Sequence, residues 1–147
     1  MKNLVIDKMT ISDLAEIANN LTSDFDEFWN SSILESEIKN PFSQYIIAKI
    51  NREIVGFAGV IDTVDQLEIT NIVVRKDFRK KGIGNELLTE LIKLAKENGK
   101  EKITLEVNNT NLAAIKLYEK NGFKNVGFRK KYYNNTYDAN IMTLKLK

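Results

Sequence analysis

The chain has 147 residues, of which 43% are hydrophobic and 29% charged, and its formal net charge is +2. This composition and length are typical of a globular protein, so we expect residues 1–147 to form a single domain. The chain contains no histidine and no cysteine. That excludes Ser-His-Asp catalysis, thiol nucleophiles, disulfides and the usual zinc sites, and it leaves proton transfer to Glu, Asp, Tyr, Lys, a terminus or water.

The charge is unevenly distributed along the chain. Residues 1–74 contain five Lys and Arg against twelve Asp and Glu, whereas residues 75–147 contain seventeen against eight. An acidic half beside a basic half suits a protein that brings a polyanionic ligand to a cationic one. We expect no direct nucleic-acid binding, because the basic residues are interleaved with acidic ones and no recognition signature is visible. Without a membrane span or a signal-peptide core, a cytoplasmic protein with no membrane contact is expected.

The first half of the chain predicts a short strand, two helices and then three strands. The expected elements, in order, are a strand at 4–6, helices at about 14–21 and 24–39, and strands at 45–50, 54–61 and 67–74. Ser12 or Asp13 can cap the first helix, and the second stops before Pro41, the only proline. Asn51-Arg52 is typical of the turn in a β-hairpin, and residues 62–66 form the next turn.

The second half alternates strands with helices. The expected elements are a helix from about 83 to 98, a strand at 102–107, a helix at 112–120, and strands at 123–133 and 139–146. A strand–helix–strand unit implies a parallel pair of strands with a crossover helix. The whole pattern predicts an α/β (α+β) fold with order β-α-α-β-β-β-α-β-α-β-β. Its sheet would be mixed and mostly antiparallel, with about seven strands flanked by about four helices.

The segment Arg79-Lys80-Lys81-Gly82-Ile83-Gly84 opens the helix that follows the third strand of the meander. Cations at a helix N-terminus oppose the macrodipole, and each glycine in a helix costs about 1 kcal/mol relative to alanine. Both features are explained if backbone N–H groups and cations there bind a phosphate-bearing ligand. A solvated basic turn is the alternative, which six residues alone leave open.

This segment, the later run Asn111-x-x-Ala114-x-x-Leu117-Tyr118-x-x-x-Gly122-Phe123 and the element order resemble the superfamily of acetyl-CoA-dependent N-acetyltransferases (GNAT). Within it, the chain looks most like the RimI-type ribosomal-protein alanine N-acetyltransferases. That likeness rests on Asn71-Ile72-Val73-Val74, Leu105-Glu106-Val107, Tyr118, Arg129-Lys130-Lys131-Tyr132-Tyr133, Asp138-Ala139 and Met142. Asn108 and Thr110 stand where that subfamily usually has Arg and Ser, and Tyr137 precedes Asp138-Ala139 where the subfamily has an acidic residue. These differences bear on the peptide substrate rather than on the CoA chemistry.

The resemblance implies acetyl-CoA as co-substrate and no metal. Backbone amides of about Lys81–Asn85 would hold its pyrophosphate, and the pantetheine arm would run along the edge of the strand that ends at Val73-Val74. A main-chain N–H there would polarise the thioester carbonyl. The expected cofactor contacts are Ile72, Val73, Val74, Arg79, Lys80, Lys81, Gly82, Ile83, Gly84, Asn85, Asn111, Ala114 and Tyr118. Asn111 can equally be explained as a helix cap alone.

Three residues are candidates for proton transfer. Tyr118 is either a core aromatic or, as the resemblance implies, the general acid for the departing CoA thiolate. Glu106 is either a surface glutamate on a strand or the general base, which is the role that the RimI-type enzymes imply. Glu68 is the rival base, because related histone acetyltransferases carry a glutamate at the equivalent place; we favour Glu106. A modest base suffices for an α-amine, whose ordinary pKa is about 7.7–8.0.

Acceptor binding is expected to involve Trp29, Asn71, Tyr132, Tyr133 and Asp138. The acidic and aromatic stretch around Trp29 is either an amphipathic helix or a wall that attracts a cationic peptide. Cross-strand packing is the alternative explanation for the tyrosines near the last turn.

The expected reaction is direct attack on acetyl-CoA, in a ternary complex, by the N-terminal α-amine of a ribosomal or other protein. Acetylation of a small amine, such as a polyamine or an aminoglycoside-like compound, is one alternative. A non-catalytic acyl-CoA sensor is another. A monomer or weak homodimer is expected.

Overall fold

The computed structural model describes residues 3–20, 36, 39–133 and 137–147. Its centre is a seven-stranded sheet with strand order β1-β2-β3-β4-β5-β7-β6. The strands are β1 Leu4–Lys8, β2 Ser43–Ile50, β3 Glu53–Asp62, β4 Gln66–Val74, β5 Lys102–Asn108, β6 Lys124–Tyr133 and β7 Tyr137–Lys145. The described helices are α1 Ile11–Asn20, α3 Ile83–Glu97 and α4 Leu112–Lys120, with a short 3-10 helix, η2, at Lys76–Phe78.

The pairing of neighbouring strands in this sheet is antiparallel except between β4 and β5, which are parallel. The predicted mixed, mostly antiparallel sheet is therefore confirmed, as is the crossover helix between two parallel strands. The helix predicted at about 24–39 falls mostly outside the described residues. Three of the helices that the sequence predicts lie within them.

The first helix begins earlier than predicted. Because α1 starts at Ile11, the prediction that Ser12 or Asp13 caps it is wrong. The backbone N–H of Asp13 donates to Thr10 Oγ1 (3.2 Å) and the backbone N–H of Thr10 donates to Asp13 Oδ2 (2.9 Å), a reciprocal capping arrangement. Burial would raise the pKa of Asp13. The hydrogen bonds from Thr10 and the ion pair with Lys49 (3.0 Å) outweigh burial and lower that pKa.

The β2–β3 hairpin forms as predicted, with its turn at Asn51-Arg52. Both residues have positive φ, 50° and 70°. A two-residue turn with positive φ at both positions matches the right-handed twist of the strands it joins. The turn after β3 leads into β4, so the predicted three-strand meander is also confirmed.

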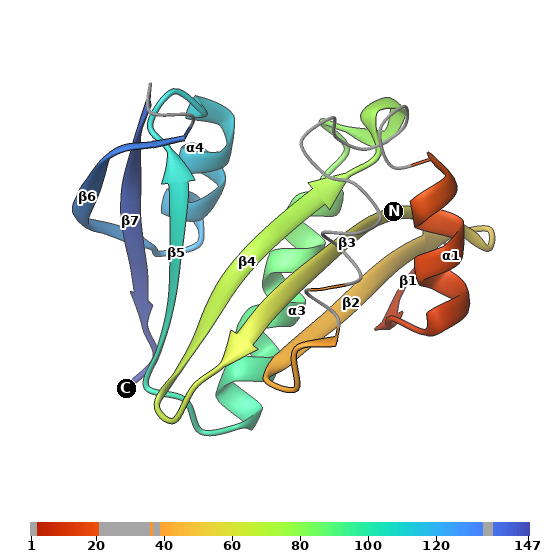
Figure 1. The fold of residues 1–147 in the computed structure, drawn as a ribbon, viewed down its shortest axis with the longest axis horizontal. Coiled ribbons are helices and arrows are strands. Elements are labelled where there is room, and N and C mark those ends of the chain that lie inside the picture. Colours follow the sequence, from red (N-terminus) through yellow and green to blue (C-terminus); the bar gives the residue numbers. More distant parts are fainter. Residues whose placement is uncertain (1–2, 21–35, 37–38, 134–136) are drawn as a thin grey trace.

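Helices α1 and α3 lie on opposite faces of the sheet (Figure 1). On one face, which we call the α3 face, the larger core cluster joins buried residues of α3 and α4 to the strands. Its α3 and α4 members are Ile83, Leu87, Leu88, Leu91, Ala95 and Tyr118. On the other, the α1 face, a smaller cluster joins Ile17 of α1 to Tyr45, Ile47, Phe57 and Val73.

One extra residue in β4 changes which face its side chains occupy. Gly59 of β3 pairs with Asn71 and Val60 pairs with Ile69, so Thr70 is a β-bulge. Before the bulge, Ile69 packs in the cluster of the α3 face, whereas after it Val73 packs in the cluster of the α1 face. The bulge therefore turns Asn71 onto the α1 face.

Strands β4 and β5 pair over only four residues each. Their ladder runs from Gln66 opposite Lys102 to Ile69 opposite Leu105 and then stops. Both strands continue, β4 paired with β3 as far as Val74 and β5 paired with β7 as far as Asn108. Figure 1 shows β4 and β5 diverging beyond their paired ends. The sheet thus separates at this end into two halves.

We predict that Gly59→Ala destabilises the fold by about 1–3 kcal/mol, the usual cost of overpacking a core. A Cβ at Gly59 would lie 2.4–2.8 Å from ring atoms of Tyr45, whose side chain is buried and hydrogen-bonded to Asn71. Thermal unfolding measures the loss. Gly127→Ala is the matched control, because its Cβ would meet nothing closer than Ile141 Cδ1 at 3.9 Å. Equal melting temperatures for the two variants would contradict the prediction.

Candidate functional site

The loop between β4 and α3 has the backbone shape of an anion site. Lys80 and Gly82 both have positive φ, 63° and 85°, on either side of Lys81. Gly82 is the N-cap of α3, and no side chain caps the first turn. Backbone N–H groups in such alternating conformations and at an uncapped helix start converge on a concavity that suits an anion. The sequence prediction of a helix opening at this loop is confirmed, and the ligand it holds stays a prediction.

Side chains within the loop stiffen it. Arg79 Nε donates to the carbonyl oxygen of Val74 (3.0 Å), so this predicted screening charge also ties the loop back to the end of β4. Arg75 forms two hydrogen bonds with Asp77 (2.7 and 3.0 Å), and these hold the pKa of Asp77 below its usual value. The Arg75 guanidinium and the Lys81 amine lie 4.6 and 5.3 Å from the ring centroid of Phe78.

The free edge of β4 presents backbone groups toward the diverging β5. The N–H of Arg75 donates to the carbonyl of Val55 in β3 (2.8 Å). Because the backbone groups of a strand alternate between its two edges, those of Ile72 and Val74 point away from β3. Ile72 and Val74, which were predicted to contact the pantetheine arm, lie beyond the last β4–β5 pair. Their backbone groups therefore face the opening between the two strands. The side chain of Val73, between them, packs on the α1 face.

Both candidate bases lie on the α1 face of the sheet. Glu68 alternates with core residues Leu67 and Ile69, and it stands level with Thr104 inside the paired stretch of β4 and β5. Glu106 lies one residue beyond the last paired residue of β5, on the side opposite Leu105. Glu106 is therefore the carboxylate at the start of the divergence, with its side chain 22% exposed.

An ion pair that the sequence analysis missed holds Glu106. Arg129 of β6 places its Nη2 2.9 Å from Glu106 Oε1. β5, which contains Glu106, and β6 are not neighbours in the sheet, because β7 lies between them. The motif that contains Arg129 was visible in the sequence. The register that brings it to Glu106 was not.

Two polar side-chain atoms at the bulge are buried without a hydrogen-bond partner: Thr70 Oγ1 and Asn71 Oδ1. Asn71 is only 9% exposed, and its Nδ2 donates to the hydroxyl of Tyr45 (3.2 Å). Buried polar groups in native proteins are seldom left unpaired. Two adjacent ones, directly after the last β4–β5 pair, are positioned to bind polar groups of a ligand. Tyr45 was not singled out by sequence, because only the β2–β3–β4 register brings it to Asn71.

Tyr118 lies on the other face of the sheet, in α4. It is buried in the cluster of the α3 face, with its ring 5.7 Å from that of Phe123. Asn121, just after α4, donates to Asn85 Oδ1 (2.9 Å) and to the carbonyl of Leu117 (2.9 Å). This link joins the end of α4 to the first turn of α3, so the predicted acid is fixed relative to the predicted phosphate loop.

The helix cap predicted for Asn111 is confirmed, since its Oδ1 accepts from the N–H of Ala114 (3.2 Å). Two of the departures from the RimI pattern interact with each other: Thr110 donates from its N–H and its Oγ1 to Asn108 Oδ1 (2.9 and 2.8 Å). Their pairing shapes the turn between β5 and α4.

The remaining predicted acceptor residues are only partly described. Trp29 lies outside the described residues, as do the side chains of Tyr132 and Tyr133, whose backbone belongs to β6. Asp138 follows the first residue of β7, and its carbonyl accepts from the N–H of Asn109 (2.9 Å).

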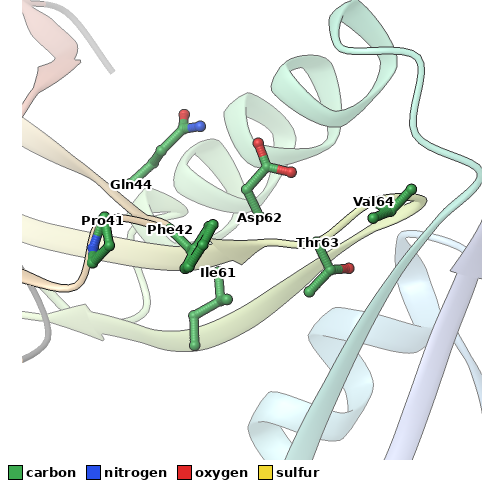
Figure 2. Close-up of a pocket in the computed structure, with 7 residues that line it drawn as sticks. All are labelled: Pro41, Phe42, Gln44, Ile61, Asp62, Thr63 and Val64. Atoms are coloured by element: carbon green, nitrogen blue, oxygen red, sulfur yellow. The ribbon is translucent and has the colours of Figure 1, made fainter.

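A surface hollow of about 530 Å³ lies at the other end of the sheet. Figure 2 shows its lining, which comes from the segment before β2, the start of β2, the end of β3 and the turn between β3 and β4: Pro41, Phe42, Gln44, Ile61, Asp62, Thr63 and Val64. This is the end where β4 and β5 are paired, so the hollow is separate from the divergence. In the part of the chain that the structure describes, no three His, Cys, Asp or Glu residues gather as a metal site, and no helix is long and apolar enough to cross a membrane.

The chain is similar in sequence and fold to known acetyltransferases. Residues 14–123 match the model of the Acetyltransferase (GNAT) family. A Bacillus subtilis protein with the provisional name ribosomal protein bS18-alanine N-acetyltransferase is 30% identical over 136 residues, which cover 91% of this chain and 90% of that protein. The crystal structure of the ribosomal-protein-S18-alanine N-acetyltransferase from Escherichia coli has a TM-score of 0.87 at 28% identity, with 98% of this chain and 94% of that chain covered.

A third similar protein was solved with a ligand. It is a Bacillus anthracis protein, provisionally named a streptothricin acetyltransferase, in complex with acetyl coenzyme A. It has a TM-score of 0.68 at 32% identity, with 77% of this chain and 68% of that chain covered. Since the family match spans most of the chain, the predicted superfamily, fold and similarity to RimI-type enzymes are confirmed. The protein belongs to the GNAT family of N-acetyltransferases.

Proposed function

We propose that this enzyme acetylates the N-terminal α-amine of a protein, by direct attack of the amine on acetyl-CoA in a ternary complex. The observation that carries the proposal is the divergence of β4 and β5 between two chemically different faces. Glu106 and Asn71 belong to the α1 face, and Tyr118 belongs to the α3 face. A thioester placed between the strands would be reached from both.

The residues around the divergence fit acetyl-CoA. The alternating backbone at Lys80–Gly82 and the uncapped start of α3 suit the pyrophosphate, and the cations Lys80 and Lys81 would offset its charge. The N–H groups of Ile72 and Val74 point toward the opening, where one of them would hydrogen-bond the thioester carbonyl as negative charge develops on its oxygen. Acetyl-CoA supplies the activated acetyl group.

Proton transfer divides between the two faces. On the α1 face, Glu106 would take a proton from the attacking amine, directly or through water, as the new N–C bond forms. On the α3 face, Tyr118 would donate a proton to the CoA sulfur as the C–S bond breaks. Since the two groups approach the reacting carbonyl from opposite sides, no covalent enzyme intermediate is required.

Glu106 suits the role of base better than Glu68 does. Glu68 stands level with Thr104 within the paired part of the two strands, where no opening separates them. Glu106 stands just beyond the last pair. The buried Asn71 Oδ1 nearby offers an acceptor for an N–H of the incoming amine.

A protein acceptor is favoured over a small amine by the two relatives named for acetylation of the ribosomal protein S18 alanine, which cover nearly the whole chain. An α-amine, whose ordinary pKa is about 7.7–8.0, is about 10–20% neutral at pH 7, whereas a lysine amine is almost wholly protonated, so one modest base is enough.

We predict that the protein releases CoA from acetyl-CoA in the presence of an Ala-starting basic peptide. The same peptide with a blocked α-amine should give only the rate measured without peptide, because the attacking group has been removed. CoA release is followed with a thiol reagent, which the protein itself cannot consume because it lacks cysteine. Turnover with a polyamine and none with the peptide would overturn the protein-acceptor proposal and leave the acetyltransferase activity.

Glu106→Gln and Glu68→Gln form a matched pair of variants. We predict that Glu106→Gln lowers kcat by about 100-fold or more, the usual contribution of a general base. Glu68→Gln should change it by less than about threefold, because its side chain lies outside the divergence. Steady-state kinetics with the Ala-starting peptide measure both effects. The reverse order of effects would assign the base to Glu68.

Gly82→Ala should weaken acetyl-CoA binding. A non-glycine residue in the left-handed region costs about 1–2 kcal/mol. The free loop of the variant is expected to relax from this conformation, and restoring it on binding lowers the affinity by up to about 5- to 30-fold. Gly99→Ala is the control, because Gly99 also has positive φ (68°) and open surroundings but lies at the far end of α3. Titration calorimetry with acetyl-CoA compares the two. Equal affinities would show that the phosphate site lies elsewhere.

A further inference from the structure

We propose that Arg129 is a positioning residue that holds the carboxylate of Glu106 in the orientation in which it accepts the amine proton. The inference rests on the proposed role of Glu106 as base. It starts from the contact of 2.9 Å between Arg129 Nη2 and Glu106 Oε1. That contact is made on the α1 face, where the acceptor amine would approach.

The register shows that this is a long-range contact across an intervening strand. Arg129 of β6 pairs with Ala139 of β7, whereas Glu106 of β5 pairs with Ile141. Neighbouring strands lie about 4.8 Å apart and residues rise about 3.4 Å along a strand. The two backbones are therefore separated by about 10 Å across the sheet and about 7 Å along it. Only a long cationic side chain in an extended conformation spans this gap.

The residue between them leaves a path. Ala139 lies opposite Arg129 in the β6–β7 ladder and is fully buried. Directly paired residues of antiparallel strands project from the same face. The small methyl group of Ala139 leaves room for the arginine side chain to extend across it toward β5.

Stability alone gives a weak reason for the pair. The Arg129 side chain is 58% exposed, and ion pairs with an exposed partner contribute little to folding free energy, since water screens them. What the pair does fix is the orientation of the carboxylate. Nη2 contacts one carboxylate oxygen, and a carboxylate can accept about four hydrogen bonds in all, so the amine or its water can still be bound.

Arg129 would act through Glu106 and not as a base. A guanidinium stays protonated in proteins, so it takes no proton from the amine. In the proposed step the amine nitrogen bonds to the acetyl carbon, the amine proton passes to Glu106, and the C–S electrons leave with the CoA sulfur. Arg129 keeps all its protons throughout. Its contribution is geometric and electrostatic.

A double-mutant cycle tests the proposal, using wild type, Arg129→Gln, Glu106→Gln and the double variant with acetyl-CoA and the Ala-starting peptide. We expect Arg129→Gln to lower kcat about 10-fold, with KM for acetyl-CoA and the melting temperature unchanged. In the Glu106→Gln background the same change should have no further effect, because the group that it positions is gone. Arg129→Lys, which keeps the charge but shortens the reach, should recover part of the loss.

Lys124→Gln is the matched control, because Lys124 is another exposed cation of β6. It pairs with Thr143 of β7, whose side chain lies on the α1 face, as that of Arg129 does. If Lys124→Gln lowered kcat as much as Arg129→Gln does, the loss would reflect the overall charge of the protein, and the proposal would be overturned. Multiplicative losses in the double variant would overturn it too, while leaving Glu106 as base. Wild-type turnover by Glu106→Gln would instead overturn the base assignment, and the positioning role with it.

A crystal structure of Arg129→Gln provides a readout that does not depend on the acceptor. The expected result is a Glu106 side chain in a different rotamer or in several. A Glu106 carboxylate ordered in its present position without Arg129 would overturn the proposal.

Discussion

The short parallel ladder between β4 and β5 is the constraint on which the site depends. Parallel strands in a sheet ordinarily pair along their shared length, because unpaired backbone groups in a protein interior are costly. Here pairing ends at Ile69 and Leu105, while each strand stays paired with its other neighbour. Two antiparallel halves are thereby held together at one end and apart at the other. A ligand with its own hydrogen-bonding groups could pair with the backbone groups on this edge of β4.

The bulge at Thr70 follows from the same constraint. It lies one residue beyond the last paired residue of β4, and it turns Asn71 from the α3 face to the α1 face. Without it, a strand with strict alternation would place Asn71 on the α3 face, away from the Tyr45 hydroxyl to which it now donates. The buried amide and hydroxyl at this point are costly to the free protein. Their position at the divergence is consistent with a cost that is recovered when polar groups of a substrate bind there.

Much of this arrangement could be predicted from sequence because it is local. Asn51-Arg52 identified the hairpin, the glycines of residues 79–84 identified the loop, and Asn111 identified the start of α4, as in the structure. What could not be predicted depends on register between distant strands: the bulge, the Tyr45–Asn71 contact and the Arg129–Glu106 ion pair. The error at α1 has a different cause. Thr10, Ser12 and Asp13 can all cap a helix, and only the backbone shows that Thr10 does so.

The distribution of groups over two faces explains how a protein without histidine or cysteine can carry out acetyl transfer. A single residue that removes a proton from the amine and also gives one to the sulfur would have to reach both the amine nitrogen and the CoA sulfur. Here the proposed base lies on the α1 face and the proposed acid on the α3 face. Each is held by a separate side-chain contact. Asn121 ties α4 to Asn85 in the first turn of α3, and Arg129 ties Glu106 across β7. The two links have no residue in common, so the acid and the base can each be fixed against acetyl-CoA and acceptor separately. Such independence suits a family in which the CoA side is shared and the acceptor side differs.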